Sequence, residues 1–187
     1  MAVRVAVLDA NVLYGIEVTD LLLTMATRRL YRPHWSPEIL DEVARNLKVR
    51  KDLEPSAIDR RIAHMNRALP GALEEPPPSL IAEMSVNDKD RHVLALAVHT
   101  GASLIVTENL RDFPQRLLRR HEVEALSVDT FVLEHVERDS VAMLGVIDAM
   151  SARRRRYPTT RRDIVEALSV GLPRAAAALT EADQGGE

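Results

Sequence analysis

The sequence contains no cysteine, and only 3% of its 187 residues are aromatic. The absence of cysteine excludes disulfide bonds, zinc sites with thiolate ligands and catalysis by a cysteine nucleophile. So few aromatic side chains argue against a stacking platform for single-stranded nucleic acid, because such platforms place bases on successive aromatic rings. The chemistry of this chain must therefore be sought among its acidic, amide and basic side chains.

Long apolar runs are also missing. No stretch approaches the roughly 20 apolar residues of a membrane-spanning helix, and the apolar segment 3–8 is too short for a signal peptide. We therefore expect a cytoplasmic protein, with one well-packed domain and a small appendage. The formal net charge of -3 argues against nonspecific nucleic-acid binding through bulk charge, although the local cluster of arginines at 153–156 can act on its own.

Short apolar runs alternate with helical patterns along the chain. The runs at 3–8, 31–35, 102–106 and 123–127 have the length and composition of buried strands. Between them, amphipathic patterns predict helices at 20–30, 36–47, 55–69 and 87–100. Ser36 followed by Pro37 is a typical helix start, Gly101 is a typical stop, and Asp129 is predicted to cap the helix after the last strand. This alternation predicts a doubly wound α/β fold with a central parallel sheet.

Four acidic or amide side chains stand where a core residue would be a poor choice. Asp9 and Asn109 each follow a predicted strand, Glu42 lies inside a predicted helix, and Asp90 lies in the first turn of another. In doubly wound sheets, sites gather outside the carboxyl ends of the strands, so Asp9 and Asn109 can meet there. Oxygen-bearing side chains of this kind suit a hard divalent cation such as magnesium.

Each of these residues also has a purely structural interpretation. Asp9 is a favoured helix cap, Asp90 suits the positive end of a helix dipole, and Asn109 is a common turn residue. Glu42 fits an ion pair on a solvated helix face. The histidines, His92 among them, show no spacing typical of a metal site and are expected at the surface or in packing.

Four segments of the chain carry a resemblance to a known family: Leu8–Leu13, Ser36–Val43, Asn87–Ala97 and Leu104–Pro114. In this order and at these separations they are similar to the motifs of PIN-domain proteins, specifically VapC-type toxins with a C-terminal helical extension. The resemblance covers roughly residues 3–132. It implies a PIN-like three-layer α/β/α fold and a metal-dependent endoribonuclease that hydrolyses phosphodiester bonds in structured RNA, such as transfer or ribosomal RNA. It also implies a cognate antitoxin protein as partner, and the family is often dimeric.

The resemblance further implies roles for individual residues. One or two Mg²⁺ or Mn²⁺ ions would be held by Asp9, Asp90 and Glu42. The implied catalytic set is Asp9, Glu42, Asp90, Asn109 and Asp112. Aspartate is frequent at the position of Asn109, so the uncharged amide weakens the case for a second ion, and Asp112 is expected to compensate from the same loop. The side chains expected to contact RNA are Asn11, Thr107, Arg153, Arg154, Arg155 and Arg156.

The character of the chain changes near residue 138, after which helical segments are joined by the arginine run. We therefore predict a nuclease domain at 1–137 and a helical extension with an arginine-rich segment at 138–187. The extension is open to several interpretations, which are dimerisation, antitoxin docking, an RNA clamp or added helical cover. Two alternatives to a toxin also remain: a non-toxic RNA-processing nuclease with the same site, and a catalytically silent module that binds RNA or protein.

Overall fold

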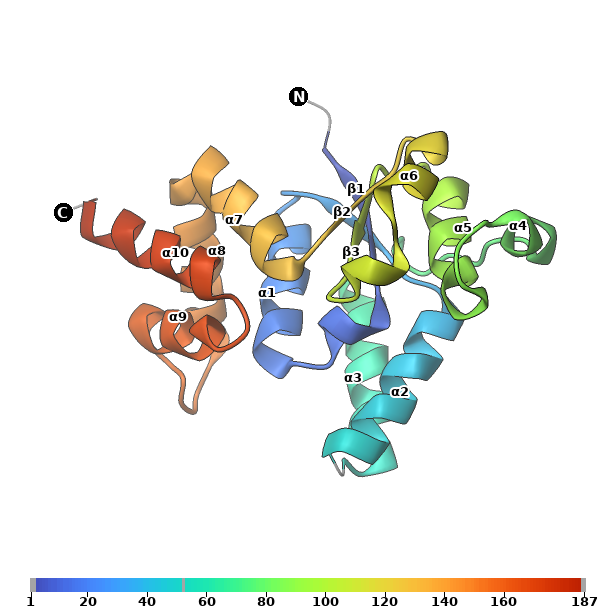
Figure 1. Ribbon diagram of the computed structural model, residues 1–187. Helices are drawn as coiled ribbons and strands as arrows, with labels where there is room; N and C mark the ends of the chain where they lie inside the picture. The colour runs from blue at the N-terminus through green and yellow to red at the C-terminus, as the bar shows by residue number, and fades with distance from the viewer. Residues whose placement is uncertain (1–2, 52, 186–187) are drawn as a thin grey trace.

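A four-stranded parallel sheet with the strand order β2-β1-β3-β4 forms the centre of the protein (Figure 1). The computed structural model describes residues 3–51 and 53–185. Its strands are β1 (Val5–Leu8), β2 (Arg32–His34), β3 (Leu104–Val106) and β4 (Glu124–Leu126). Val7 of β1 pairs with His34 on one side and with Ile105 on the other. The carboxyl ends of β1 and β3 are therefore neighbours, as the sequence predicts.

Helices cover both faces of this sheet, so the fold is a three-layer α/β/α arrangement with additional C-terminal helices (Figure 1). The α-helices are α1 (Ile16–Thr27), α2 (Pro37–Lys51), α3 (Pro55–Ala68), α4 (Pro78–Glu83), α5 (Arg91–Thr100), α6 (Gln115–Leu118), α7 (Val128–Arg138), α8 (Ser140–Arg153), α9 (Arg161–Ser169) and α10 (Pro173–Gly185). Short 3-10 helices are η1 (Ala10–Leu13), η2 (Asp88–Asp90), η3 (Leu110–Asp112) and η4 (Arg119–His121). The predicted α/β class is thus confirmed.

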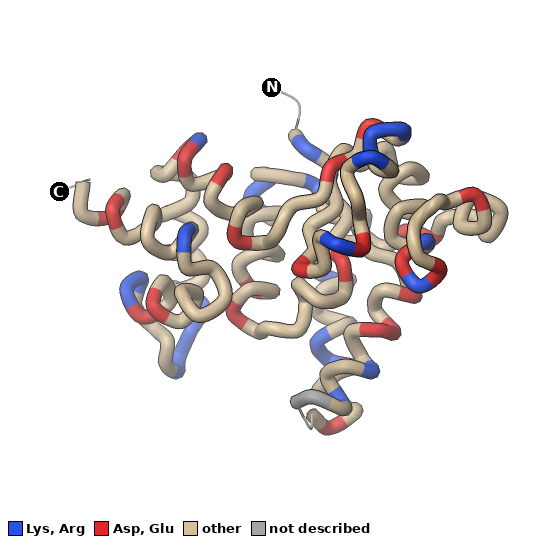
Figure 2. Tube along the Cα trace, viewed as in Figure 1, with Lys and Arg blue, Asp and Glu red and all other residues tan. Residues whose placement is uncertain are grey.

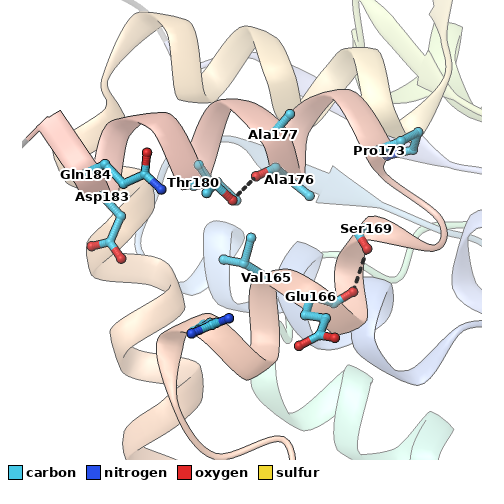
Figure 3. Close-up of a pocket in the computed structure, with 11 residues that line it drawn as sticks. Val165, Glu166, Ser169, Pro173, Ala176, Ala177, Thr180, Asp183 and Gln184 are labelled. Carbon is cyan, nitrogen blue, oxygen red and sulfur yellow. Dashed lines mark hydrogen bonds between the residues drawn. The ribbon is translucent and has the colours of Figure 1, made fainter.

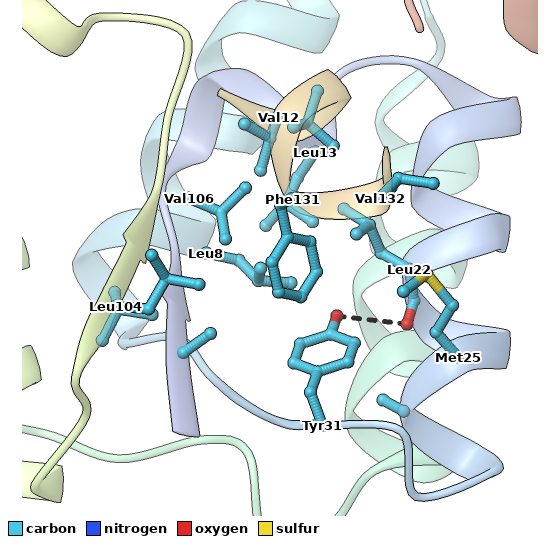
Figure 4. Close-up of a cluster of buried hydrophobic side chains, with 14 of the residues drawn as sticks. Leu8, Val12, Leu13, Leu22, Met25, Tyr31, Leu104, Val106, Phe131 and Val132 are labelled. Carbon is cyan, nitrogen blue, oxygen red and sulfur yellow. Dashed lines mark hydrogen bonds between the residues drawn. The ribbon is translucent and has the colours of Figure 1, made fainter. Parts of the chain in front are cut away.

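The core on one face of the sheet is formed by α1 and α7 against β1 and β3 (Figure 4). Phe131 of α7 lies over this face, and its ring meets Tyr31 edge-on at a centroid distance of 5.0 Å. The Tyr31 hydroxyl is buried but donates a hydrogen bond to the Leu22 carbonyl at 3.1 Å, so its polar end is satisfied. Alternate strand residues such as Val7 and Ile105 face the other side, where α5 packs on β1 and β3.

The predicted start of α2 and the predicted end of α5 are confirmed, whereas the predicted start of α5 is wrong in detail. Ser36 accepts a hydrogen bond from the Ile39 N–H at 3.2 Å where α2 begins, and Gly101 ends α5 with a left-handed φ of 64°. The segment before α5 is a 3-10 turn, so Asp90 is the N-cap of α5 and not part of its first turn. This geometry turns the Asp90 side chain inward, and only 8% of the residue is exposed.

Asp129 does not cap the helix in which it lies, so that prediction is wrong. Ser127 caps α7 by accepting from the Thr130 N–H. The Asp129 carboxylate instead accepts from the N–H groups of Arg174 at 3.3 Å and Ala175 at 2.9 Å, at the start of α10. Helix starts leave unsatisfied N–H groups, and here a carboxylate 46 residues earlier in the chain satisfies two of them.

The C-terminal helices pack on the rest of the protein over several elements. The helix α8 contacts α1 and α7, and α10 contacts α7, α8 and α9. Only Asp139 separates α7 from α8. The domain boundary at residue 137 stays a prediction, and the contacts show that the helices on its two sides are packed together. Within the described residues, no helix is long and apolar enough to cross a membrane.

Replacing Asp129 by alanine should lower the free energy of unfolding by about 1 kcal/mol, because loss of an N-cap side chain typically has this effect. The measurement is urea denaturation followed by circular dichroism. Asp59→Ala is the matched control, since Asp59 is exposed on α3 and should change stability by less than about 0.5 kcal/mol. Equal effects of the two substitutions would contradict a capping role for Asp129.

Candidate active site

Asp9 lies directly after β1, where its carboxylate is buried and held by several donors. Its N–H continues the sheet by donating to the Val106 carbonyl of β3 at 3.0 Å. The carboxylate oxygen Oδ1 accepts from the Ala10 N–H at 2.7 Å, and Oδ2 accepts from the Thr107 hydroxyl and the Asn11 amide, each at 2.6 Å. Burial raises the pKa of Asp9, and the hydrogen bonds from Thr107 and Ala10 offset part of this effect. Asp9 is thus fixed in position at the edge of the sheet.

Asn11 and Thr107 form a small hydrogen-bonded network behind Asp9. The Asn11 amide also donates to the Thr107 hydroxyl at 3.1 Å, and its carbonyl oxygen accepts from the Glu108 N–H at 2.9 Å. The Asn109 N–H donates to the same hydroxyl at 3.0 Å. These bonds give Asn11 and Thr107 a role in orienting Asp9 and the loop after β3. Their predicted contact with RNA stays a prediction.

Asp90 brings a second buried carboxylate to the same region. Its oxygen Oδ2 is buried and has no hydrogen-bond partner among the described residues, and the Nζ atom of Lys89 lies 3.7 Å from it. Burial raises the pKa of Asp90 to about 6, and the negative charges of Asp112 and Asp9 add to the increase, whereas Lys89 offsets part of it. A buried oxygen without a donor and an elevated pKa both show that negative charge is unfavourable here.

Asp112, in the loop after β3, lies close enough to Asp90 for its charge to raise the pKa of Asp90, and its predicted catalytic role stays a prediction. Its carboxylate accepts from the Lys89 ammonium at 2.7 Å and from the Asn87 amide at 3.4 Å. These contacts connect η3 to the segment that precedes α5. Asn109 contributes less than expected, because its side chain is exposed and forms no hydrogen bond with the described carboxylates. Asp112 is therefore the acidic side chain that this loop presents near Asp90.

Glu42 of α2 reaches the group through a contact that sequence reasoning missed. His92 is only 2% exposed, and its Nε2 lies 3.2 Å from Oε1 of Glu42. Burial lowers the pKa of His92, but the hydrogen bond to Glu42 and the charges of Glu38 and Glu42 outweigh it, so the pKa is raised. The electrostatic interaction of Glu42 with Asp9 also raises the pKa of Asp9. His92 is thus a packing residue, as expected, but it also binds a candidate site residue.

The four carboxylates fit a divalent cation by their chemistry. Within residues 3–51 and 53–185, no three acidic or histidine side chains converge tightly enough to form a complete ligand set. Magnesium, however, usually keeps several waters and binds through one or two carboxylates, so a looser acidic group suffices. The unpartnered oxygen of Asp90 and the raised pKa values of Asp9 and Asp90 would both be relieved by a bound cation.

The arginine run begins at the last residue of α8 and continues into the connection to α9, and it contacts α1 (Figure 2). Arg153 contacts Asp20 of α1 at 2.8 Å, and Arg154 contacts the same carboxylate at 2.8 Å. Two of the four guanidinium groups are therefore neutralised within the protein and bind the extension to α1. Arg155 and Arg156 form no ion pair with the described residues, and RNA binding by this run stays a prediction.

Two hollows of the C-terminal region differ in their relation to the carboxylates. A groove of about 670 Å³ lies between α9 and α10, with Val165, Ala176 and Thr180 in its wall, and includes none of the candidate site residues (Figure 3). A smaller hollow of about 270 Å³ is lined by Asn11, Glu108 and Gly171 among others. The turn between α9 and α10 therefore shares a hollow with Asn11, whose amide bonds to Asp9, although the hollow itself includes none of the four carboxylates.

Asp90→Asn should stabilise the metal-free protein, because it removes an unfavourable buried charge while keeping the shape of the side chain. The folded-state pKa of Asp90 is about 6 against a usual value of 3.8, so folding favours its protonated form. The stability that this group contributes is present below about pH 3.8 and is lost as the pH rises to about 6. The gain in the variant should therefore grow between these pH values and then level off.

Urea denaturation with chelator at a series of pH values measures this gain. Asp59→Asn serves as the control, since Asp59 is exposed and lies outside the acidic group. A gain that does not depend on pH would contradict the assignment of a raised pKa to Asp90.

Comparisons with known proteins agree with this geometry. Residues 5–111, more than half of the chain, match the model of the PIN domain, and residues 128–181 match the model of the VapC50 C-terminal domain. A protein of Mycobacterium tuberculosis (strain ATCC 25618 / H37Rv) named "Putative ribonuclease VapC50" is 38% identical over 102 residues. That alignment covers 52% of this chain and 58% of the relative, so the chain spans less than two thirds of the relative's length. No solved structure matches.

The PIN match includes three of the carboxylates described above, Asp9, Glu42 and Asp90, and also Asn109. It ends at residue 111, just before Asp112. The second match begins with α7 and includes the helices that pack around it. With its acidic group at the carboxyl ends of β1 and β3 and its matched residues in this order, the chain belongs to the PIN-domain family.

Proposed function

We propose that this protein is a metal-dependent endoribonuclease that hydrolyses phosphodiester bonds in structured RNA. The observation that carries the proposal is the group of carboxylates at one edge of the sheet, with the unpartnered oxygen of Asp90 inside it. Membership of the PIN family and the ribonuclease name of the mycobacterial relative support the same activity. Asp9, Asp90 and Glu42 would hold Mg²⁺ or Mn²⁺, with Asp112 at the edge of the group.

The cation supplies two kinds of chemistry when it is bound: it activates a water molecule and neutralises charge on the phosphoryl and leaving oxygens. The residues of the chain supply the rest. Asp9 is oriented by Ala10, Asn11 and Thr107, so its oxygens need no reorganisation before they bind. Asp90 must lose its proton to act as a ligand, and its pKa of about 6 allows this at neutral pH. Asn109 adds no charge, which is consistent with one ion or with a weakly held second one.

We further propose that the protein is the toxin of a toxin–antitoxin pair, with transfer or ribosomal RNA as its target and an antitoxin protein as its partner. The similarity of this chain to the mycobacterial protein supports this assignment, since that protein carries the VapC name. The turn between α9 and α10 shares a hollow with Asn11, which bonds to Asp9, so we expect the C-terminal region to influence which RNA reaches the carboxylates. A homodimer in the cytoplasm is the assembly that we expect.

Asp9→Asn should reduce cleavage of total cellular RNA by roughly 100-fold or more, because even the loss of groups that only orient metal ligands reduces activity 10- to 100-fold. Cleavage is measured on gels with Mg²⁺, with Mn²⁺ and with chelator, and discrete products should appear only with metal. Asp59→Asn, on an exposed face of α3, should cleave like the unaltered protein. Metal-independent cleavage, or equal cleavage by Asp9→Asn, would reject the proposed site.

Induced expression in a bacterial host tests the toxin assignment separately from the nuclease. We expect growth arrest with the unaltered protein and with Asp59→Asn. At equal protein levels, Asp9→Asn should allow normal growth, because this variant lacks a carboxylate of the site. Normal growth with an unaltered protein that cleaves RNA in vitro would instead favour a non-toxic processing nuclease. If the folded protein cleaves no RNA, the result would favour the alternative of a catalytically silent module that binds RNA or protein.

A further inference from the structure

His92 is a buried histidine at the start of α5, and its ring lies against α2, the helix that carries Glu42. It belongs to the first turn of α5, two residues after Asp90, and its side chain is 3% exposed. Its ring faces α2, where Glu38 and Glu42 lie one helical turn apart on the same face. A histidine in this place contacts the acidic group from inside the protein and not from the solvent.

The contact of His92 with Glu42 has the geometry of a hydrogen bond. Nε2 of His92 lies 3.2 Å from Oε1 of Glu42, whereas Nδ1 lies 3.8 Å from Oε2 of Glu38 and has no hydrogen-bond partner among the described residues. An ionised carboxylate can only accept hydrogen bonds, so Nε2 must carry the proton and donate it. This assigns a single specific bond from His92, directed at Glu42.

The orientation of the Glu42 carboxylate depends on fewer hydrogen bonds than the orientations of the Asp9 and Asp112 carboxylates. Asp9 receives hydrogen bonds from three groups, and Asp112 receives them from two. The carboxylate of Glu42, whose side chain is 30% exposed, is bonded among the described residues by His92 alone. Glutamate has a long flexible side chain, so without this bond its carboxylate would sample many orientations.

We propose that His92 is a positioning residue that holds the Glu42 carboxylate in the orientation needed to bind the divalent cation. This inference rests on the proposed function, because it assigns Glu42 to the metal site. The bond also links α2 to the start of α5, so it fixes Glu42 relative to Asp90. Groups that orient metal ligands in this way change metal affinity 10- to 100-fold when they are removed.

The test compares Mn²⁺ binding to the whole protein by titration calorimetry and by electron paramagnetic resonance. His92→Leu fills the space without a donor and should weaken Mn²⁺ binding 10- to 100-fold. His92→Gln places an amide N–H near the position of Nε2 and should restore most of the affinity. His135→Leu is the matched control, since His135 is another buried histidine, in α7, bonded to the Phe131 carbonyl and not to a site carboxylate. It should bind Mn²⁺ within about twofold of the unaltered protein.

A double substitution shows whether His92 acts through Glu42. Glu42→Ala should weaken Mn²⁺ binding, and adding His92→Leu to it should cause no further loss, because both changes remove the same interaction. A second readout needs no metal. In the metal-free protein labelled with ¹⁵N in histidine, the His92 Nε2–H resonance should be protected from exchange, and Glu42→Ala should abolish this protection while leaving His92 itself in place.

The outcomes separate this inference from the proposed function. Binding of Mn²⁺ by His92→Leu as tight as by the unaltered protein would overturn the inference while the nuclease assignment stands. Equal loss in His92→Leu and His92→Gln, or an additive loss in the double variant, would also overturn it, because the hydrogen bond would then not be the cause. Failure of the unaltered protein to bind Mn²⁺ at all would instead overturn the metal site on which the inference rests.

Discussion

The parallel pairing of β1 with β3 is the constraint on which the site depends. It places the end of each strand at the same edge of the sheet, so Asp9 and Thr107 come within hydrogen-bond distance although 98 residues separate them. The Asn11 amide then joins both side chains and also receives the N–H of Glu108. One carboxylate is thereby fixed by the sheet itself, and α2 and α5 bring the other carboxylates to it.

The same arrangement concentrates negative charge in a partly buried place, where charge is unfavourable without partners. Lys89 and His92 are the basic side chains that contact Asp112 and Glu42 there, and neither gives Oδ2 of Asp90 a hydrogen bond. Folding without a cation therefore leaves part of the electrostatic repulsion uncompensated. Proteins commonly retain such strain at functional sites and offset it elsewhere, here with an extensive apolar core around Phe131 and Tyr31.

The sequence indicates the parallel sheet, the start of α2 and the end of α5 because each depends on residues close together in the chain. The apolar runs alone identify strands, and Ser36, Pro37 and Gly101 act within one helical turn. The position of Asp9 at the sheet edge also follows, since parallel strands bring their carboxyl ends together, whereas the same argument for Asn109 does not predict that its side chain is exposed. Other features depend on contacts between distant segments. The Glu42–His92 bond spans 50 residues, and Arg153 contacts α1 from the far end of α8. Neither contact can be recognised from a pattern of neighbouring residues in the sequence.

The carboxylate of Asp129 has a consequence for how the chain folds as a whole. It satisfies the first N–H groups of α10, while Phe131, two residues later in the same helix, packs into the core on the sheet. Opening of the sheet core would therefore also release the start of α10, and loss of α10 would expose the face of α7 that packs against it. A fragment ending at residue 137 would keep the capping carboxylate but lose the helix that it caps. We therefore expect the C-terminal helices to unfold together with the core on the sheet.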